Sequence, residues 1–339
     1  MRCAHDFACT QMGARTIQHG REAWGWRGRT LGRPVMTAGG VAWLRVAFAS
    51  TDPFVCPFWN GNIEAEAGLP RSIPRPRLRA WHDWSDQLGL YRAELFDHTS
   101  RRTVADSAAI ATLPDLPDRW WAALRNALDD IATVAINRVA IQQGFLDWVM
   151  PRYLGAPIDT LAPTSWATAH GELHYANLCA PDLCLLDWEG WGIAPRGYDA
   201  AMLHSYSLLV PEAAERVRRE LGHILDTPDG RFAELVVISE LLHAADRGSH
   251  LELIQPLRQR AARLLGRGLP AYTDMRSSVY GPATPCSLDP TGGFVGDVIQ
   301  SRSIHLFDED DDATNSSQRY DHRCGKGEAP PCTIDHPGG

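Results

Sequence analysis

The stretch AHGELHYANLCAPDLCLLDWEGWG, residues 169–192, decides the fold, because it places several polar side chains beside two apolar runs. Asn177 precedes the first run and Asp187 follows the second, and the Pro181–Asp182 pair between the runs is typical of a turn. NLCA and LCLLDWE therefore predict the two strands of a hairpin. Such a hairpin would fold Asn177 towards Asp187, so that an amide oxygen and a carboxylate oxygen converge.

Converging hard oxygen donors favour magnesium as the bound ion. Glu172 lies on the loop before the hairpin, where its carboxylate could accept a proton from a hydroxyl group. Metal-bound phosphates and a group that orients the attacking hydroxyl are the parts that phosphoryl transfer requires. His170 and His174 could instead suggest zinc, but their order is not HExxH and a glycine follows the first, so we expect structural histidines.

The segments HGELHYAN and LLDWEGWGIAPRGYD resemble the signature of the aminoglycoside phosphotransferase family, whose fold is related to that of protein kinases. The resemblance is strong over residues 169–199 and extends more weakly, in the order of elements, from about residue 24 to 265. It implies an α+β, two-lobed protein-kinase-like fold with a small β-rich N-lobe and a larger, mainly helical C-lobe. It also implies that Asn177 and Asp187 hold Mg²⁺, that Glu172 takes the catalytic-base position, and that Asp199 supports the loop.

Two positions depart from the family pattern. The family's base is an aspartate, whereas Glu172 adds a methylene, and displacements of about 1 Å can cost on the order of 100-fold in rate. The family's phosphate-pairing lysine is also missing, because the only lysine of the chain is Lys326. Arg45, in VAWLRVA, is the expected substitute, with a planar fork in place of a point charge. Glu64 or Glu66 is its expected partner; they lie about 200° apart around a helix, and we favour Glu64.

The remaining nucleotide contacts are predicted on weaker signals. Four glycines before the Arg45 strand could cover the phosphates, although no clean GxGxxG is present: Gly28, Gly32, Gly39 and Gly40. The stretch AELFDHTS, which includes Glu94, is the expected hinge whose backbone pairs with adenine. Cys179 and Cys184 flank the hairpin turn, where we expect buried thiols and not a redox pair.

The chain is predicted to consist of a loose N-terminus (1–20), a nucleotide-binding N-lobe (21–95), a catalytic helical C-lobe (96–272) and a disordered tail (273–339). GRTLGRPV reads as turn-rich, and VAWLRVAFA as a buried strand. A helix is expected in DLPDRWWAALRNALDDIATV, capped by Asp115 or Asp118. Further helices are expected around Phe145 and over 212–225, 231–245 and 251–265. The tail carries residues of zinc-like composition, which we expect to be unrelated to a metal site: His322, Cys324, Cys332 and His336.

Bulk composition limits the function classes. The formal net charge of −8 argues against a general nucleic-acid or anionic-membrane binder. The apolar runs are too short to span a bilayer, and eight cysteines in 339 residues do not form a disulfide framework, so a reducing cytoplasm is expected.

The first hypothesis is therefore an ATP- or GTP-dependent kinase that uses Mg²⁺ and acts on a hydroxyl of a small molecule. An aminoglycoside-like antibiotic or an amino-alcohol, which is a cationic acceptor, would fit the family resemblance. The second hypothesis is a catalytically weak or inactive pseudokinase-like module that binds a nucleotide or a partner. The third, a metallohydrolase that uses His170, His174 and Asp187, is the least favoured.

Overall fold

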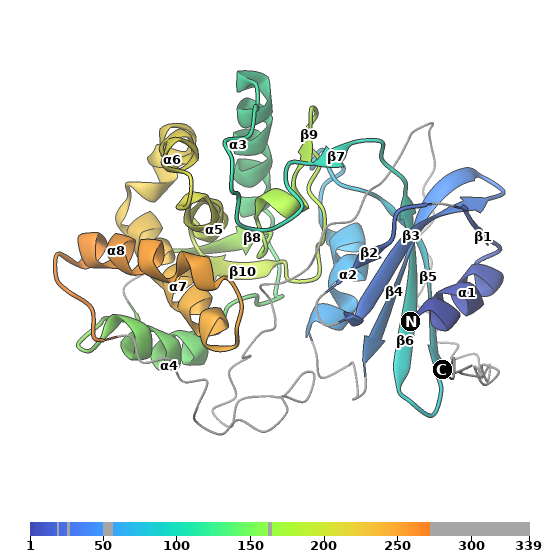
Figure 1. The fold of residues 1–339 in the computed structure, drawn as a ribbon, viewed down its shortest axis with the longest axis horizontal. Coiled ribbons are helices and arrows are strands. Elements are labelled where there is room, and N and C mark those ends of the chain that lie inside the picture. Colours follow the sequence, from blue (N-terminus) through green and yellow to red (C-terminus); the bar gives the residue numbers. More distant parts are fainter. Residues whose placement is uncertain (19, 26–27, 50–56, 162–164, 272–339) are drawn as a thin grey trace, which may run out of the picture. The chain divides into compact units, whose positions relative to one another are not determined.

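The structure is a computed structural model that describes residues 1–18, 20–25, 28–49, 57–161 and 165–271 (Figure 1). These residues form two compact units: the described parts of Met1–Pro53 with Pro76–Ser100, and the described parts of Phe54–Arg75 with those of residues 101–271. The first unit is mainly β-sheet and the second mainly helical, so the predicted α+β class is confirmed. No helix in the described part of the chain has the length and apolar character needed to cross a membrane. The predicted disordered tail, with its zinc-like cysteines and histidines, lies outside the described residues.

The first unit is built on one antiparallel sheet in the order β1-β3-β4-β6-β5, with β2 also pairing with β3. Its strands are β1 (Arg15–Thr16), β2 (Ala23–Trp24), β3 (Thr30–Thr37), β4 (Gly40–Ala49), β5 (Leu78–Ser85) and β6 (Leu90–Asp97). The predicted buried strand VAWLRVAFA is β4, which lies between β3 and β6 and has six consecutive buried residues in the pattern of a central strand.

The prediction that GRTLGRPV is turn-rich was wrong, because most of it belongs to β3. Gly32 lies opposite Arg45 in the β3–β4 register, and a Cβ at Gly32 would come within 2.6 Å of the Trp43 indole. The glycine therefore makes room for a buried tryptophan inside a strand, and it does not mark a turn.

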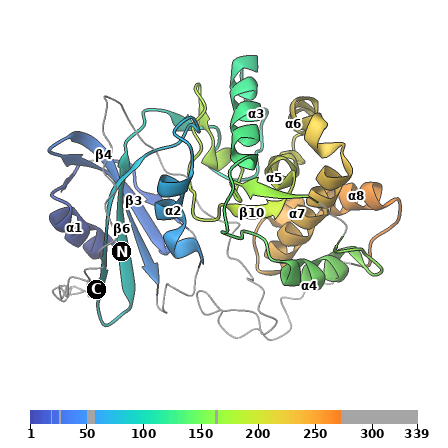
Figure 2. The ribbon, with the colours of Figure 1, turned by 180° about the vertical axis from the view of Figure 1, so that it is seen from behind.

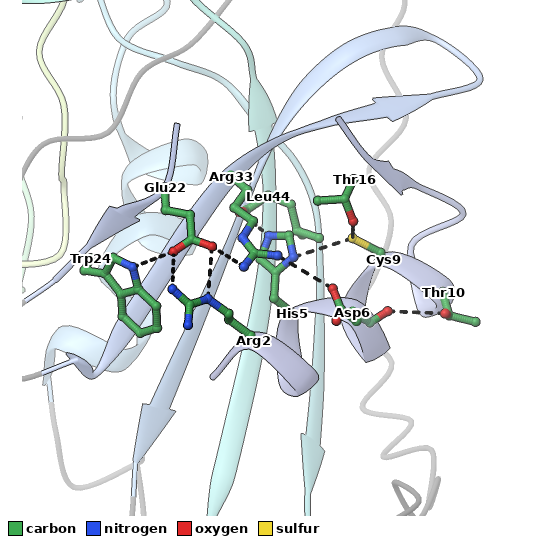
Figure 3. Close-up of polar contacts among 10 residues, drawn as sticks. All are labelled: Arg2, His5, Asp6, Cys9, Thr10, Thr16, Glu22, Trp24, Arg33 and Leu44. Atoms are coloured by element: carbon green, nitrogen blue, oxygen red, sulfur yellow. Dashed lines mark hydrogen bonds and ion pairs between the residues drawn. The ribbon is translucent and has the colours of Figure 1, made fainter. Parts of the chain in front are cut away.

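The N-terminus is also not loose. Arg2–Gln11 form helix α1, which packs on the sheet with Ala8 and Cys9 buried (Figure 1). His5 is buried under this helix, and its Nε2 donates to the Leu44 carbonyl at 3.1 Å, while its Nδ1 lies 3.6 Å from the Cys9 thiol (Figure 3). One face of β4 is thus covered by α1.

A charged cluster fixes the start of α1 to the sheet (Figure 3). The Glu22 carboxylate accepts from Arg2, from the Trp24 indole and from Arg33. The Arg2 hydrogen bond, followed by those from Trp24 and Arg33, lowers the pKa of Glu22 to about 2 against the opposing effect of desolvation. The cluster therefore ties the helix to β2 and β3.

The second unit consists of seven helices among the described residues, with short strands and 3-10 turns between them. The helices are α2 (Gly61–Gly68), α3 (Asp118–Ala132), α4 (Gln143–Leu154), α5 (Tyr198–Ser207), α6 (Pro211–Leu225), α7 (Pro228–Asp246) and α8 (Ile254–Leu265). The strands are β7 (Arg102–Thr103), paired with β9 (Cys179–Ala180), and β8 (Trp166–Ala169), paired with β10 (Gly192–Pro195). The 3-10 turns are Pro57–Asn60, Tyr175–Asn177 and Leu251–Leu253.

The helices predicted from the sequence are present as α3, α4, α6, α7 and α8. The predicted cap of α3 was wrong, since Pro117 is the N-cap and Asp118 is already the first helical residue. Helix α5 was not predicted. It packs against α6 and α7 (Figure 2), and all ten of its residues are buried.

Candidate functional site

The hairpin predicted from the sequence is present in the second unit. Leu178 and Leu185 form an antiparallel bridge, the Cys179 amide donates to the Cys184 carbonyl at 3.0 Å, and the Leu186 amide donates to the Asn177 carbonyl at 2.9 Å. This pairing places Asn177 directly across from Leu186, the residue before Asp187. The two predicted metal ligands therefore lie at the same end of one hairpin.

Asn177 is fully buried, and its amide has a defined orientation. Its Nδ2 donates to the Glu172 carbonyl at 3.1 Å and lies 3.3 Å from Nε2 of His174. Its Oδ1 is buried and has no hydrogen-bond partner. Because both acceptors lie on the nitrogen side, the oxygen is left available for a ligand.

Asp187 likewise has a side-chain oxygen that is available for a ligand. It is one of two non-glycine residues with positive φ in the described part of the chain, at 61°, and its Oδ1 is buried without a hydrogen-bond partner. A buried oxygen of this kind costs free energy unless something binds it. A left-handed backbone at a non-glycine residue also costs energy, and such residues cluster at functional sites.

The loop before the hairpin is held by Asp199, which confirms its predicted supporting role. One carboxylate oxygen accepts from the His170 amide at 2.7 Å, and the other accepts from the Gly171 amide at 3.0 Å. Burial raises the pKa of Asp199 to about 6, although these two amides act in the opposite direction. Asp199 lies in the first turn of α5, so the helix that was not predicted is the element that positions this loop.

The same loop packs directly on the residues around Asp187. Gly171 has φ of +87°, and a Cβ there would lie 2.4 Å from the Gly190 carbonyl oxygen, so only a glycine allows this approach. Nε2 of His170 donates to the Leu186 carbonyl at 2.9 Å, and the His170 ring packs edge-on against Trp188 at 4.5 Å between centroids. These contacts bring the segment that carries Glu172 against the segment that carries Asp187.

The two histidines of the loop have the structural roles that the sequence predicted. The Glu172 amide donates to Nδ1 of His170 at 3.3 Å, so His170 is the neutral Nε2–H tautomer. Burial lowers the pKa of His170 to about 4 and that of His174 to about 3, which keeps both rings uncharged at neutral pH. The described residues contain no group of three or more His, Cys, Asp or Glu side chains arranged to hold a metal, and the zinc alternative gains no support.

Comparison with solved structures identifies proteins of similar fold. A thermostable mutant of aminoglycoside phosphotransferase APH(4)-Ia, in a ternary complex with ADP and hygromycin B, matches with a TM-score of 0.54 and 12% sequence identity, over 79% of this chain and 99% of that chain. The chain has the aminoglycoside phosphotransferase fold. A second structure of APH(4)-Ia matches with a TM-score of 0.52 and 12% identity, over the same shares. No protein-family profile and no curated protein sequence matches the chain.

In this aminoglycoside phosphotransferase fold Arg45 forms an ion pair within the sheet unit. Nη1 of Arg45 donates to Oε2 of Glu94 at 2.6 Å, and both side chains are buried within the sheet unit. Glu64 belongs to α2 in the other unit, where it pairs with Arg138 at 2.6 Å. The predicted Arg45–Glu64 pair would join the two units and stays a prediction. The cross-strand register explains the observed pair, since Arg45 and Glu94 lie directly opposite each other on β4 and β6.

Glu94 was predicted to lie in the hinge, but it lies in the middle of β6, which pairs with β4 on one side and β5 on the other. Backbone groups in a central strand are used by the two neighbouring strands, so Glu94 does not offer them to an adenine. Strand β6 ends at Asp97.

Proposed function

We propose that the protein is a phosphotransferase that moves the terminal phosphoryl group of ATP or GTP to a hydroxyl group of a small molecule, with Mg²⁺ as cofactor. The observation that carries the proposal is the pair of buried oxygens without hydrogen-bond partners, Asn177 Oδ1 and Asp187 Oδ1, at one end of a hairpin. The fold supports the proposal, since the APH(4)-Ia structure that it matches contains ADP and an antibiotic.

The donor set fits magnesium. One amide oxygen and one carboxylate oxygen are hard ligands, and Mg²⁺ in phosphotransferases commonly takes few protein ligands because nucleotide phosphates and water complete its shell. Asn177 and Asp187 would hold the ion, which when bound neutralises charge on the phosphates. The Nδ2 contacts of Asn177 keep its oxygen directed away from the Glu172 loop.

Glu172 would act as the group that accepts the proton of the acceptor hydroxyl at its carboxylate. It is buried, with 6% of its surface exposed, and its own backbone carbonyl is bound by Asn177. The residue that orients the acceptor and the residue that holds the metal therefore share one hydrogen bond. Charge neutralisation and alignment would supply most of the catalysis.

The proposed acceptor is a small hydroxylated molecule such as an aminoglycoside-like antibiotic or an amino-alcohol. Hygromycin B in the APH(4)-Ia complex is one precedent in this fold. A panel of hydroxylated amines and antibiotics, assayed for phosphate acceptance from ATP and from GTP, would identify the class.

The first test is nucleotide binding, followed by turnover. We expect ATP or GTP to raise the melting temperature only when Mg²⁺ is present, and a member of the panel to become phosphorylated. Substitution Glu172→Gln should lower kcat by about 10²- to 10⁴-fold, the usual contribution of a general base, while Mg²⁺-nucleotide binding persists. Absence of any nucleotide effect on the wild type would reject the proposal.

The variant Glu172→Asp tests the extra methylene. If the loop is adapted to glutamate, the shorter side chain should misplace the carboxylate and reduce kcat without changing nucleotide binding. A rise in kcat would show instead that glutamate is a handicap at this position.

The second candidate is a module that binds a nucleotide without turnover. The observation that favours it is the buried Arg45–Glu94 pair, which places the expected substitute for the missing lysine in an ion pair with a strand carboxylate. Stabilisation by Mg²⁺-nucleotide without turnover on any acceptor would select this alternative. The phosphate-binding role of Arg45 stays a prediction.

A further inference from the structure

We propose that Arg138 is a positioning residue for the metal site, because it fixes the segment 187–191, here called the Asp187 loop, and thereby sets the affinity for Mg²⁺. The inference rests on the proposed function, since it concerns the same ion. Arg138 lies between α3 and α4, outside every segment that resembles the family signature.

The guanidinium of Arg138 donates hydrogen bonds to three different groups. Nε donates to the Trp191 carbonyl and Nη2 to the Glu189 carbonyl, each at 2.5 Å, and Nη1 pairs with the Glu64 carboxylate at 2.6 Å. Two of these acceptors are backbone carbonyls of the Asp187 loop. A planar fork with several donors can satisfy this arrangement, whereas a point ammonium cannot match all three directions.

The Asp187 loop needs these hydrogen bonds because the backbone of its first residue is strained. Asp187 has a left-handed backbone, and a conformation of this kind persists only when surrounding contacts determine it. On the hairpin side the Trp188 indole donates to the Leu185 carbonyl at 3.1 Å. At the other end of the loop, Arg138 donates to the carbonyls of Glu189 and Trp191. The carboxylate of Asp187 therefore lies on a segment fixed at both ends.

Arg138 is itself held rigidly. Its carbonyl accepts from the Ile193 amide at 2.7 Å, and the Ile193 carbonyl accepts from the amides of Ala140 and Ile141. Val139 forms a parallel bridge with Ile193, and Gly192 leaves no room for a Cβ beside the Ala140 amide. The backbone at Arg138 is thus held against β10 by hydrogen bonds and one isolated bridge, which fixes the origin of the side chain.

Hydrogen bonds and an ion pair also connect the Asp187 loop and Arg138 to α2. The Trp191 indole donates to the Gly61 carbonyl at 2.9 Å, and a Cβ at Gly61 would lie 2.2 Å from the Glu189 carbonyl oxygen. Glu64, one turn further along α2, supplies the carboxylate that pairs with Arg138. A shift of α2 would therefore be transmitted to the loop that carries the metal ligand.

The test compares four variants of the full chain. Arg138→Gln removes the guanidinium and its charge, and Arg138→Lys keeps the charge without the planar guanidinium. Glu64→Gln removes only the ion pair between Arg138 and α2. The matched control is Arg125→Gln, which removes an arginine that pairs with Glu220 in the same unit and does not touch the loop. Two quantities are measured with ADP present: the Mg²⁺ concentration that gives half of the rise in melting temperature, and Mn²⁺ binding by electron paramagnetic resonance.

We expect Arg138→Gln to raise the half-effect concentration of Mg²⁺ by about 10- to 100-fold, the usual loss when a residue that orients a metal ligand is removed. Arg138→Lys should recover part of the loss, Glu64→Gln should weaken binding less because that carboxylate is half-exposed, and Arg125→Gln should match the wild type. With an acceptor, the KM for Mg²⁺ should rise while kcat at saturating Mg²⁺ stays near the wild-type value.

A purely structural role for Arg138 gives a different result. It would lower the melting temperature of the metal-free protein and leave the half-effect concentration of Mg²⁺ unchanged, and this would overturn the inference while the proposed function stands. If Arg138→Gln does not fold, unchanged Mg²⁺ binding in both Arg138→Lys and Glu64→Gln would overturn it equally. A wild type that shows no Mg²⁺-dependent nucleotide effect would overturn both proposals.

Discussion

Asp187 has two properties that substitution can test separately. Its carboxylate has a buried oxygen without a hydrogen-bond partner, and its backbone occupies the left-handed region. Asparagine tolerates that backbone region at least as well as aspartate, but it carries no charge to hold a cation.

Substitution Asp187→Asn should therefore leave the metal-free melting temperature unchanged or raise it slightly, and should abolish the Mg²⁺-dependent effect of nucleotide. Calorimetry with and without Mg²⁺-ADP measures both quantities. Asp182→Asn, at the exposed tip of the same hairpin, is the matched control and should behave like the wild type. A variant Asp187→Asn that binds Mg²⁺ normally would show that Asp187 is not a ligand.

At the residue scale, the sequence predicted what depends on local spacing. Glu172, Asn177 and Asp187 come together because a single loop and hairpin connect them, and the Asp199 contact follows from the first turn of the next helix. The partner of Arg45 could not be predicted, since it depends on the register of two strands 49 positions apart in the chain. Arg138 was missed because nothing in its neighbourhood signals that it binds two carbonyls more than 50 positions away.

At the scale of elements, helix periodicity predicted α3 and α6 because each has one buried and one exposed face. The same reasoning missed α5, since a helix buried on all sides shows no such alternation. It missed β3 because Gly32 and Pro34 read as a turn when their strand neighbours are unknown. In both cases tertiary contacts determine the element.

The contact between α5 and α7 predicts how the free energy of unfolding depends on pH. The Tyr198 hydroxyl donates to Oε2 of Glu240 at 2.6 Å, and burial raises the pKa of Glu240 to about 8, although Tyr198 and Arg247 act to lower it. Between about pH 4.5 and 8 the folded protein therefore keeps a proton that the unfolded chain has released. The free energy of unfolding should fall as pH rises through this window.

Substitution Glu240→Gln removes that proton while keeping an oxygen for Tyr198. Its melting temperature should match the wild type near pH 5 and exceed it increasingly towards pH 9, at roughly 1–2 °C for each kcal/mol in a chain of this size. The control Glu212→Gln, on the exposed side of α6, should track the wild type throughout. Parallel melting curves for Glu240→Gln and the wild type over the whole range would contradict the prediction.

At the scale of the whole molecule, nearly all positive charge is arginine. Lys326 is the one lysine of the sequence, so a permanently charged side chain that contacts phosphate before it must be an arginine. Acylation of amines should therefore leave Mg²⁺-nucleotide binding intact, whereas an arginine-selective dicarbonyl reagent should abolish it. Prior addition of Mg²⁺-ATP should protect the chain against the dicarbonyl, as thermal shift would show. Loss of binding after amine acylation would contradict this expectation.

The packing of His170 on the Trp188 indole gives the chain a built-in spectroscopic reporter. Trp188 is adjacent to Asp187 in the chain and buried, so the electric field at its indole depends on the charge and position of the neighbouring carboxylate. In protein carrying fluorinated tryptophan, the resonance of this one indole would register cation occupancy directly, before any acceptor has been identified.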